Sequence, residues 1–220
     1  MKKTSLLIII GLALMLTAVP VSAQGTGGEK EYRFTIKTNP LAALGGPFWV
    51  LGVIPVTGEY KLLFEAAVSE KTSFQIGAGY LGPSILINLD ELTDEEGEIS
   101  GIKTSGFRVQ GMFKYFISRD LPAPEGFYLG PHVSYAAATI KNKSNVQDNL
   151  KASKLNVNAV IGYQMITSGG FTLDIFTGMG FVSRKWDLNT DNTETDFDLG
   201  VFKNRVSASI PFGVSFGYAF

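Results

Sequence analysis

The stretch that decides the fold starts at Val206, ends at Phe220 and reads VSASIPFGVSFGYAF. Apolar residues, most of them bulky, stand at every second position, and small or polar residues stand between them. This period of two is typical of a β-strand with two different faces. A strand that crosses a bilayer needs about 9–11 residues, so the stretch is long enough to span a membrane with its apolar face against lipid. The alternative, an edge strand of a soluble sandwich, would leave that aromatic-rich face uncovered.

The N-terminus has the features of a secretory signal peptide. Lys2 and Lys3 form a basic start, an apolar run follows over residues 6–19, and Val21-Ser22-Ala23 is a small-residue cleavage site. We predict cleavage after Ala23, which divides the chain into a signal peptide, residues 1–23, and one domain, residues 24–220. An uncleaved anchor helix fits less well, because the apolar run is shorter than a bilayer span and ends at Pro20.

Charge and cysteine content exclude several classes of function. The chain has 19 basic and 20 acidic residues and no cysteine. Loss of Lys2 and Lys3 with the signal peptide would leave 17 basic residues and a net charge of about −3, so there is no electrostatic basis for binding nucleic acid. Without cysteine, the chain has no disulfides, no thiol chemistry and no cysteine-linked lipid anchor.

The same alternation recurs along the chain and predicts eight strands. They cover approximately residues 31–37, 54–68, 73–80, 106–118, 126–139, 154–165, 171–184 and 206–220. The connections are long after the first, third, fifth and seventh strands and short after the others, which is the pattern of outer-membrane barrels with short periplasmic turns. We therefore predict an all-β fold: an eight-stranded antiparallel transmembrane up-and-down β-barrel after a cleaved signal peptide, with both termini in the periplasm.

The C-terminal stretch resembles the assembly signal of bacterial outer-membrane barrels, which ends on an aromatic residue with apolar residues at alternate positions before it. The residues that carry this resemblance are Phe212, Val214, Phe216, Tyr218 and Phe220. The whole chain resembles small outer-membrane barrels of the OmpA/OmpX/OmpW type, and more specifically the barrel proteins without assigned activity that are abundant in Bacteroidetes. The resemblance implies an integral, monomeric outer-membrane protein with two partners, membrane lipid and the barrel-assembly machinery. It does not define an activity, because the fold hosts pores, adhesins, enzymes and anchors.

An eight-stranded barrel is just wide enough for side chains to fill its interior. The residues predicted to form an inward polar network are Arg33, Lys37, Glu59, Lys61, Glu65, Arg108, Lys114, His132, Asp174 and Arg184. Because an unpaired buried charge is costly, we expect ion pairs and hydrogen bonds that fill the lumen. A path for protons or ions is the alternative. Basic side chains outnumber acidic ones in this set by six to three, which raises the hypothesis that water or an anion shares the lumen.

His132 is the only histidine of the chain, so any histidine-dependent hydrolysis would use it. His132 and Ser134 are similar to the His-x-Ser of outer-membrane lipid A deacylases, which add a glutamate about a dozen residues later. Here Asn145-Val146-Gln147-Asp148 occupies that vicinity, without a glutamate, and the alternation points His132 into the lumen. We therefore expect a hydrogen-bonded lumen histidine. A G-x-G-x-x-G match that starts at Gly77 is not followed by a helix signal and is read as strand glycines.

Two further features concern the surface. The acidic run from Asp90 to Glu98 offers carboxylates for calcium, but its spacing is not that of an EF-hand, and a solvated extracellular loop is the more consistent interpretation. Aromatic residues are expected at the membrane interfaces, and the candidates are Tyr32, Trp49, Tyr115, Tyr128, Tyr163, Trp186 and Tyr218.

These observations predict a barrel without catalytic residues, cofactor or metal. Its structural or surface-interaction role would be carried by extracellular loops at residues 86–104 and 186–198. The alternatives are a narrow pore or small-solute channel and, third, a lipid A-modifying hydrolase that uses His132.

Overall fold

The computed structural model describes residues 32–50, 54–55, 57–85, 102–119, 121–142, 149–189 and 205–220. The predicted signal peptide, the acidic run and most of the two predicted surface loops lie outside these residues. Among the described residues, no helix is both long and apolar enough to cross a membrane.

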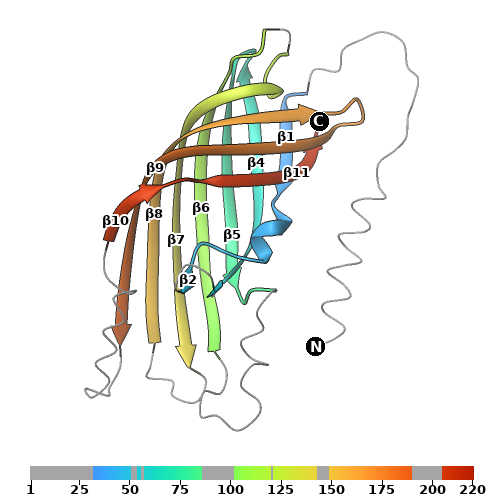
Figure 1. Ribbon diagram of the computed structural model, residues 1–220. Helices are drawn as coiled ribbons and strands as arrows, with labels where there is room; N and C mark the ends of the chain where they lie inside the picture. Colours follow the sequence, from blue (N-terminus) through green and yellow to red (C-terminus); the bar gives the residue numbers. More distant parts are fainter. Residues whose placement is uncertain are drawn as a thin grey trace.

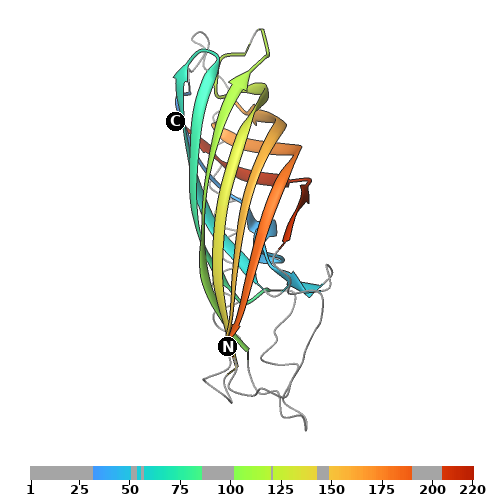
Figure 2. The ribbon, with the colours of Figure 1, turned by 90° about the vertical axis from the view of Figure 1, so that its left-hand side faces the viewer.

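The strands form one closed antiparallel sheet (Figures 1 and 2). Its strands are β1 (Phe34–Thr38), β4 (Gly58–Ser69), β5 (Thr72–Gly82), β6 (Ile102–Phe116), β7 (Gly126–Asn142), β8 (Asn149–Ile166), β9 (Phe171–Asn189), β10 (Arg205–Ser209) and β11 (Phe212–Ala219). The link between β1 and β4 holds a short 3-10 helix, η1 (Pro40–Ala43), and a two-stranded ribbon of β2 (Trp49–Val50) and β3 (Ile54–Pro55). β11 pairs with β9 on one side and with β1 on the other, which closes the ring.

β10 and β11 together form the eighth strand of the wall. Ser209 pairs with Gly180 and Phe212 pairs with Thr177, so the register along β9 continues across the break. The break falls at Pro211, which has no backbone N–H for the ladder. With this reading the predicted eight-stranded antiparallel barrel is confirmed.

The alternation of faces along the strands is confirmed as well. On β4, for example, Leu62 and Phe64 are exposed on the outside of the barrel, whereas Leu63 and Glu65 are buried inside it. The described outer surface carries exposed aromatic and branched aliphatic side chains on every strand of the wall. A sheet whose apolar face points outward and whose polar face points inward is the reverse of a soluble barrel.

The short connections lie at the same end of the barrel as the start of β1 and the end of β11. The Phe34 backbone N–H donates to the Phe220 carbonyl over 3.0 Å, and the Tyr32 hydroxyl donates to the Ser168 carbonyl in the β8–β9 turn over 2.8 Å. In Figure 1 this end is at the top.

Several strands extend further than the sequence indicated. β9 continues to Asn189 and includes Trp186, β6 begins at Ile102 and includes Thr104, and β7 and β8 pair from Lys141 with Asn149 onwards. These positions were predicted to be loops because their side chains are polar. Backbone pairing does not require apolar side chains, so the ladder continues past the point where the apolar pattern fades.

Candidate binding pocket in the barrel wall

A cluster of two lysines and two acids fills the lumen near the short turns. Lys37 Nζ lies 2.7 Å from Asp174 Oδ2 and also pairs with Glu65. Lys114 Nζ lies 2.8 Å from the same Asp174 oxygen and 3.1 Å from Glu65 Oε2. Both ammonium groups donate to Gln164 Oε1 over 2.7 Å. The four charges cancel and are buried with Gln164, so this lysine–acid cluster is a neutral, well-paired filling.

Tyr128 on β7 packs against the lysine–acid cluster. Its hydroxyl donates to Asp174 Oδ1 over 2.6 Å, and its ring lies 4.4 Å from Lys114 Nζ in a cation–π contact. The side chain is 0 % exposed, so the prediction that Tyr128 belongs to an interfacial aromatic belt is wrong. Tyr128 stands on the inward face of β7, so its ring points into the lumen. There Asp174 accepts a hydrogen bond from its hydroxyl.

An apolar filling occupies the lumen nearer to the long connections. The link after β1 turns inward, and Phe48 packs against Leu81, Ala136, Ala138 and Ala152. Trp186 packs edge-on against Phe48 with ring centroids 5.9 Å apart. Trp186 therefore belongs to the lumen filling, and its predicted place in an interfacial belt is wrong, because it stands on the inward face of a strand that continues past it.

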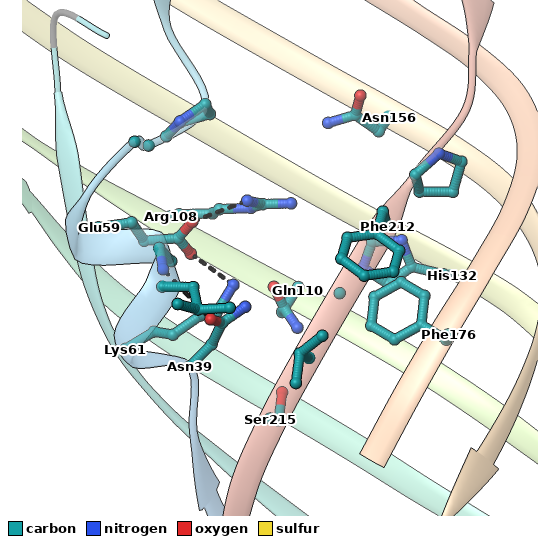
Figure 3. Close-up of a pocket in the computed structure, with 18 of the residues that line it drawn as sticks. Asn39, Glu59, Lys61, Arg108, Gln110, His132, Asn156, Phe176, Phe212 and Ser215 are labelled. Atoms are coloured by element: carbon teal, nitrogen blue, oxygen red, sulfur yellow. Dashed lines mark hydrogen bonds and ion pairs between the residues drawn. The ribbon is translucent and has the colours of Figure 1, made fainter.

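A cavity of about 520 Å³ lies between these two fillings. We call it the lateral pocket. Its floor is polar: Glu59 and Lys61 come from β4, Arg108 from β6, and Lys154 and Asn156 from β8. In Figure 3, η1 lies on one side of the pocket and β11 on the other, and the side chains of Arg108, Gln110 and Asn156 lie between them.

The pocket opens through the wall because β1 leaves the sheet early. β1 pairs with β11 only from Thr35 to Thr38, and the chain then bends inward at η1. Residues 209–215 of the neighbouring strand consequently line the pocket, and no described strand pairs with them on that side. The rim of this gap consists of exposed apolar side chains, namely Leu41 (53 %), Trp49 (41 %), Ile210 (83 %) and Phe212 (70 %).

Positive charge exceeds negative charge inside the lateral pocket. Glu59 is shared by two bases: its Oε2 lies 2.9 Å from Arg108 Nη1 and its Oε1 lies 3.3 Å from Lys61 Nζ. Lys154 Nζ donates to the Pro47 carbonyl over 3.1 Å. Within the described part of the chain, no acid lies at ion-pair distance from Lys154. Among the described residues that line the pocket, three basic side chains and one carboxylate give a formal charge of +2 when histidine is counted as neutral.

His132 lies at the back of the pocket, buried against the Phe176 ring. Its Nδ1 lies 3.4 Å from Asn158 Nδ2, and its Nε2 has no hydrogen-bond partner. Ser134 Oγ instead accepts from Arg108 over 3.0 Å and from Asn156 over 3.1 Å. The two side chains therefore bond to different neighbours, and His132 is placed as a lumen histidine.

Two predicted network residues lie elsewhere. Arg33 precedes β1 and is exposed, so its assignment to the buried network is wrong. Arg33 follows the same alternation as the inward residues Thr35 and Lys37. It lies before the first residue of β1, however, at the end of the barrel. Arg184 faces the lumen, is half-buried and donates to Ser207 Oγ over 3.0 Å, on the strand next to the pocket.

The residues of the predicted assembly signal all stand on the outward face of β11 and the residue after it. Phe212, Tyr218 and Phe220 are exposed, and Val214 and Phe216 are half-buried. Phe220 packs against Phe34 with ring centroids 5.9 Å apart, so the end of the described chain contributes to the seam between β11 and β1.

The lateral pocket itself was missed from the sequence. The alternation along residues 154–165 gives Lys154 and Asn156 inward positions, but nothing in the pattern joins them to Glu59 and Arg108. The available signal was the stretch after β1, where Pro40, Gly45, Gly46 and Pro47 indicate that the first strand ends or bends. No group of three or more metal-ligating side chains occurs in the described residues.

Fold and site together define a closed eight-stranded antiparallel β-barrel with an apolar exterior, a lumen filled at two levels and a basic pocket in its wall. Comparisons of the chain with models of protein families, with curated proteins and with solved structures found no match.

Proposed function

We propose that the chain is a non-enzymatic, monomeric β-barrel of the bacterial outer membrane that does not conduct ions along its axis and has a structural or surface-interaction role. A signal peptide at residues 1–23 and both termini in the periplasm belong to this proposal. The observation that carries it is the combination of an apolar outer surface with a sealed lumen. Such an apolar outer surface is stable against lipid, whereas its exposure to water would be unfavourable.

The sealed lumen favours this function over the narrow pore. Lys37, Lys114 and Glu65 are fully buried at one level, and Phe48 and Leu81 are buried at the other. An ion that moved along the axis would have to displace a neutral ion-pair cluster and an apolar filling in turn, and both displacements are costly.

Conductance tests the proposal directly. We expect protein that is folded into a planar bilayer to give no reproducible single-channel steps, because both fillings block the axis. Membrane fractionation of cells that express the protein checks that the barrel is recovered with the outer membrane. Stable steps of one size would support the pore instead, and recovery in a soluble fraction would contradict the membrane location.

The proposed assembly partner leads to a second prediction. Phe220→Ala should lower the amount of folded barrel in the outer membrane several-fold, because it removes the last aromatic residue of the predicted assembly signal and its contact with Phe34. The matched control is Phe181→Ala on β9, which removes another exposed outward phenylalanine away from the seam. Quantitative immunoblotting of outer-membrane fractions measures both. Equal losses for the two variants would mean that Phe220 acts only as a lipid-facing side chain.

A further inference from the structure

We propose that the lateral pocket binds an amphiphile that has one anionic head group and one hydrocarbon chain, and that this molecule enters through the gap in the wall. The route from the lipid phase depends on the proposed membrane location. Binding itself depends only on the pocket and is tested in detergent solution.

The head group follows from the charge of the pocket. Lys61, Arg108 and Lys154 approach the same cavity, and Glu59 is the only carboxylate among the described residues that line it. The lysine–acid cluster lies close to the pocket, and its two lysines are balanced by two acids. One filling of the lumen is thus neutral, whereas the pocket retains an excess of +2. A carboxylate or phosphate group would complete it, and hydrogen bonds between ionised groups are the strongest available.

The pocket also offers donors to such a group. Arg108 Nε is buried without a hydrogen-bond partner, although both terminal nitrogens of the same guanidinium are engaged. His132 Nε2 is buried and unpartnered as well. Figure 3 shows Arg108 and Asn156 reaching into the same space from β6 and β8. A buried donor without a partner costs free energy that an anionic oxygen would recover.

The hydrocarbon chain follows from the route into the pocket. The two lumen fillings close both axial directions, so the gap between η1 and residues 209–215 is the opening that the described residues leave. Leu41, Trp49, Ile210 and Phe212 make its rim apolar and exposed. A free inorganic anion has no favourable contact with such a rim, whereas an alkyl chain does.

Trp49 provides a local reporter for a binding experiment. It lines the pocket, and the other tryptophan, Trp186, packs in the apolar filling. In a Trp186→Phe background, a brominated chain that enters the gap should quench Trp49 fluorescence. The probes are ω-bromododecanoate, ω-bromododecanol and ω-bromododecyl-trimethylammonium, which share one chain and differ in head-group charge. The detergent is a neutral maltoside. We expect the carboxylate to bind at least about tenfold more tightly than the other two.

Two pairs of variants locate the site. Lys154→Gln should weaken the binding of ω-bromododecanoate about tenfold, because it removes the pocket cation that has no acidic partner. Lys151→Gln lies three residues earlier on β8, is exposed, changes the net charge equally and should leave binding unchanged. Ser209→Phe fills the pocket side of the gap and should abolish quenching, whereas Ala208→Phe points outward and should not. Heat-modifiable migration on gels confirms that each variant is folded.

Three results would overturn the proposal. Equal affinities for the three probes would show that the pocket does not select an anion. Equal effects of Lys154→Gln and Lys151→Gln would place binding outside the pocket. Competition by inorganic phosphate as strong as that by dodecanoate would identify a site for a free anion. A barrel that binds dodecanoate in detergent but is not recovered with the outer membrane would contradict the proposed function and leave the binding site standing.

Discussion

Asp174→Asn should lower the free energy of unfolding by about 3–5 kcal/mol, the cost of breaking a buried ion-pair network by removal of one partner. The substitution keeps the shape of the side chain but leaves Lys37 and Lys114 with only Glu65, so one positive charge stays buried without compensation. It also replaces an oxygen that accepts from Lys37 and Lys114 or from Tyr128 with an amide donor. Equilibrium unfolding in urea, followed by tryptophan fluorescence in detergent or lipid, measures the change.

A double-mutant cycle separates charge from shape. Lys114→Gln together with Asp174→Asn restores neutrality among the remaining charges, so we expect the double variant to be at least about 1–2 kcal/mol more stable than the sum of the two single effects. Asp187→Asn is the matched control, since Asp187 is an exposed acid on the same strand, and a change within about 0.5 kcal/mol is expected. Additive single effects would show that the four charges do not act as one network.

The wall of the barrel was predictable because one rule governs it. Along most of each strand an apolar outward residue alternates with a small or polar inward one, and register follows from that pattern. Lys37, Glu65, Lys114 and Asp174 were accordingly predicted to face the lumen from four different strands. Which of them meet could not be read from the sequence, because it depends on the stagger of strands around the ring.

The pocket could not be predicted for a related reason. It exists because β1 is short and because Phe48 returns into the lumen, and both are non-local outcomes of the link after Thr38. Prolines and glycines in the link indicated a bend, but they carry no information on its direction. Trp186 shows the same limit, because it lay beyond the predicted strand 171–184, whereas the alternation along residues 126–139 already gave Tyr128 an inward position. Composition suggested interfacial aromatics, whereas their inward positions along β7 and β9 decide where the rings lie.

Gly217→Val should prevent closure of the barrel, with a loss of about 3 kcal/mol or more in stability or no folded protein at all. A Cβ at this position would overlap the Ile36 carbonyl oxygen and lie 2.7 Å from Lys37 Cα. Both are backbone atoms of the partner strand, so no side-chain rotation relieves the overlap. The seam has little length to absorb a local shift, because β1 and β11 pair from Thr35 to Thr38 with Ala219 to Phe216 and beyond that through Phe34 and Phe220.

Gly111→Val is the control that makes this outcome informative. Gly111 stands on β6, and a Cβ there would meet no atom within 4 Å, so the same substitution should leave folding intact and add a side chain with high strand propensity. Heat-modifiable migration on gels reports the closed barrel, and equilibrium unfolding gives the loss of stability. If Gly217→Val migrated and unfolded like Gly111→Val, β11 would not approach β1 as closely as the register requires, and the seam would be open. The lateral gap would then extend along the full length of β11, and Phe48 and the lysine–acid cluster would no longer be sealed inside a ring.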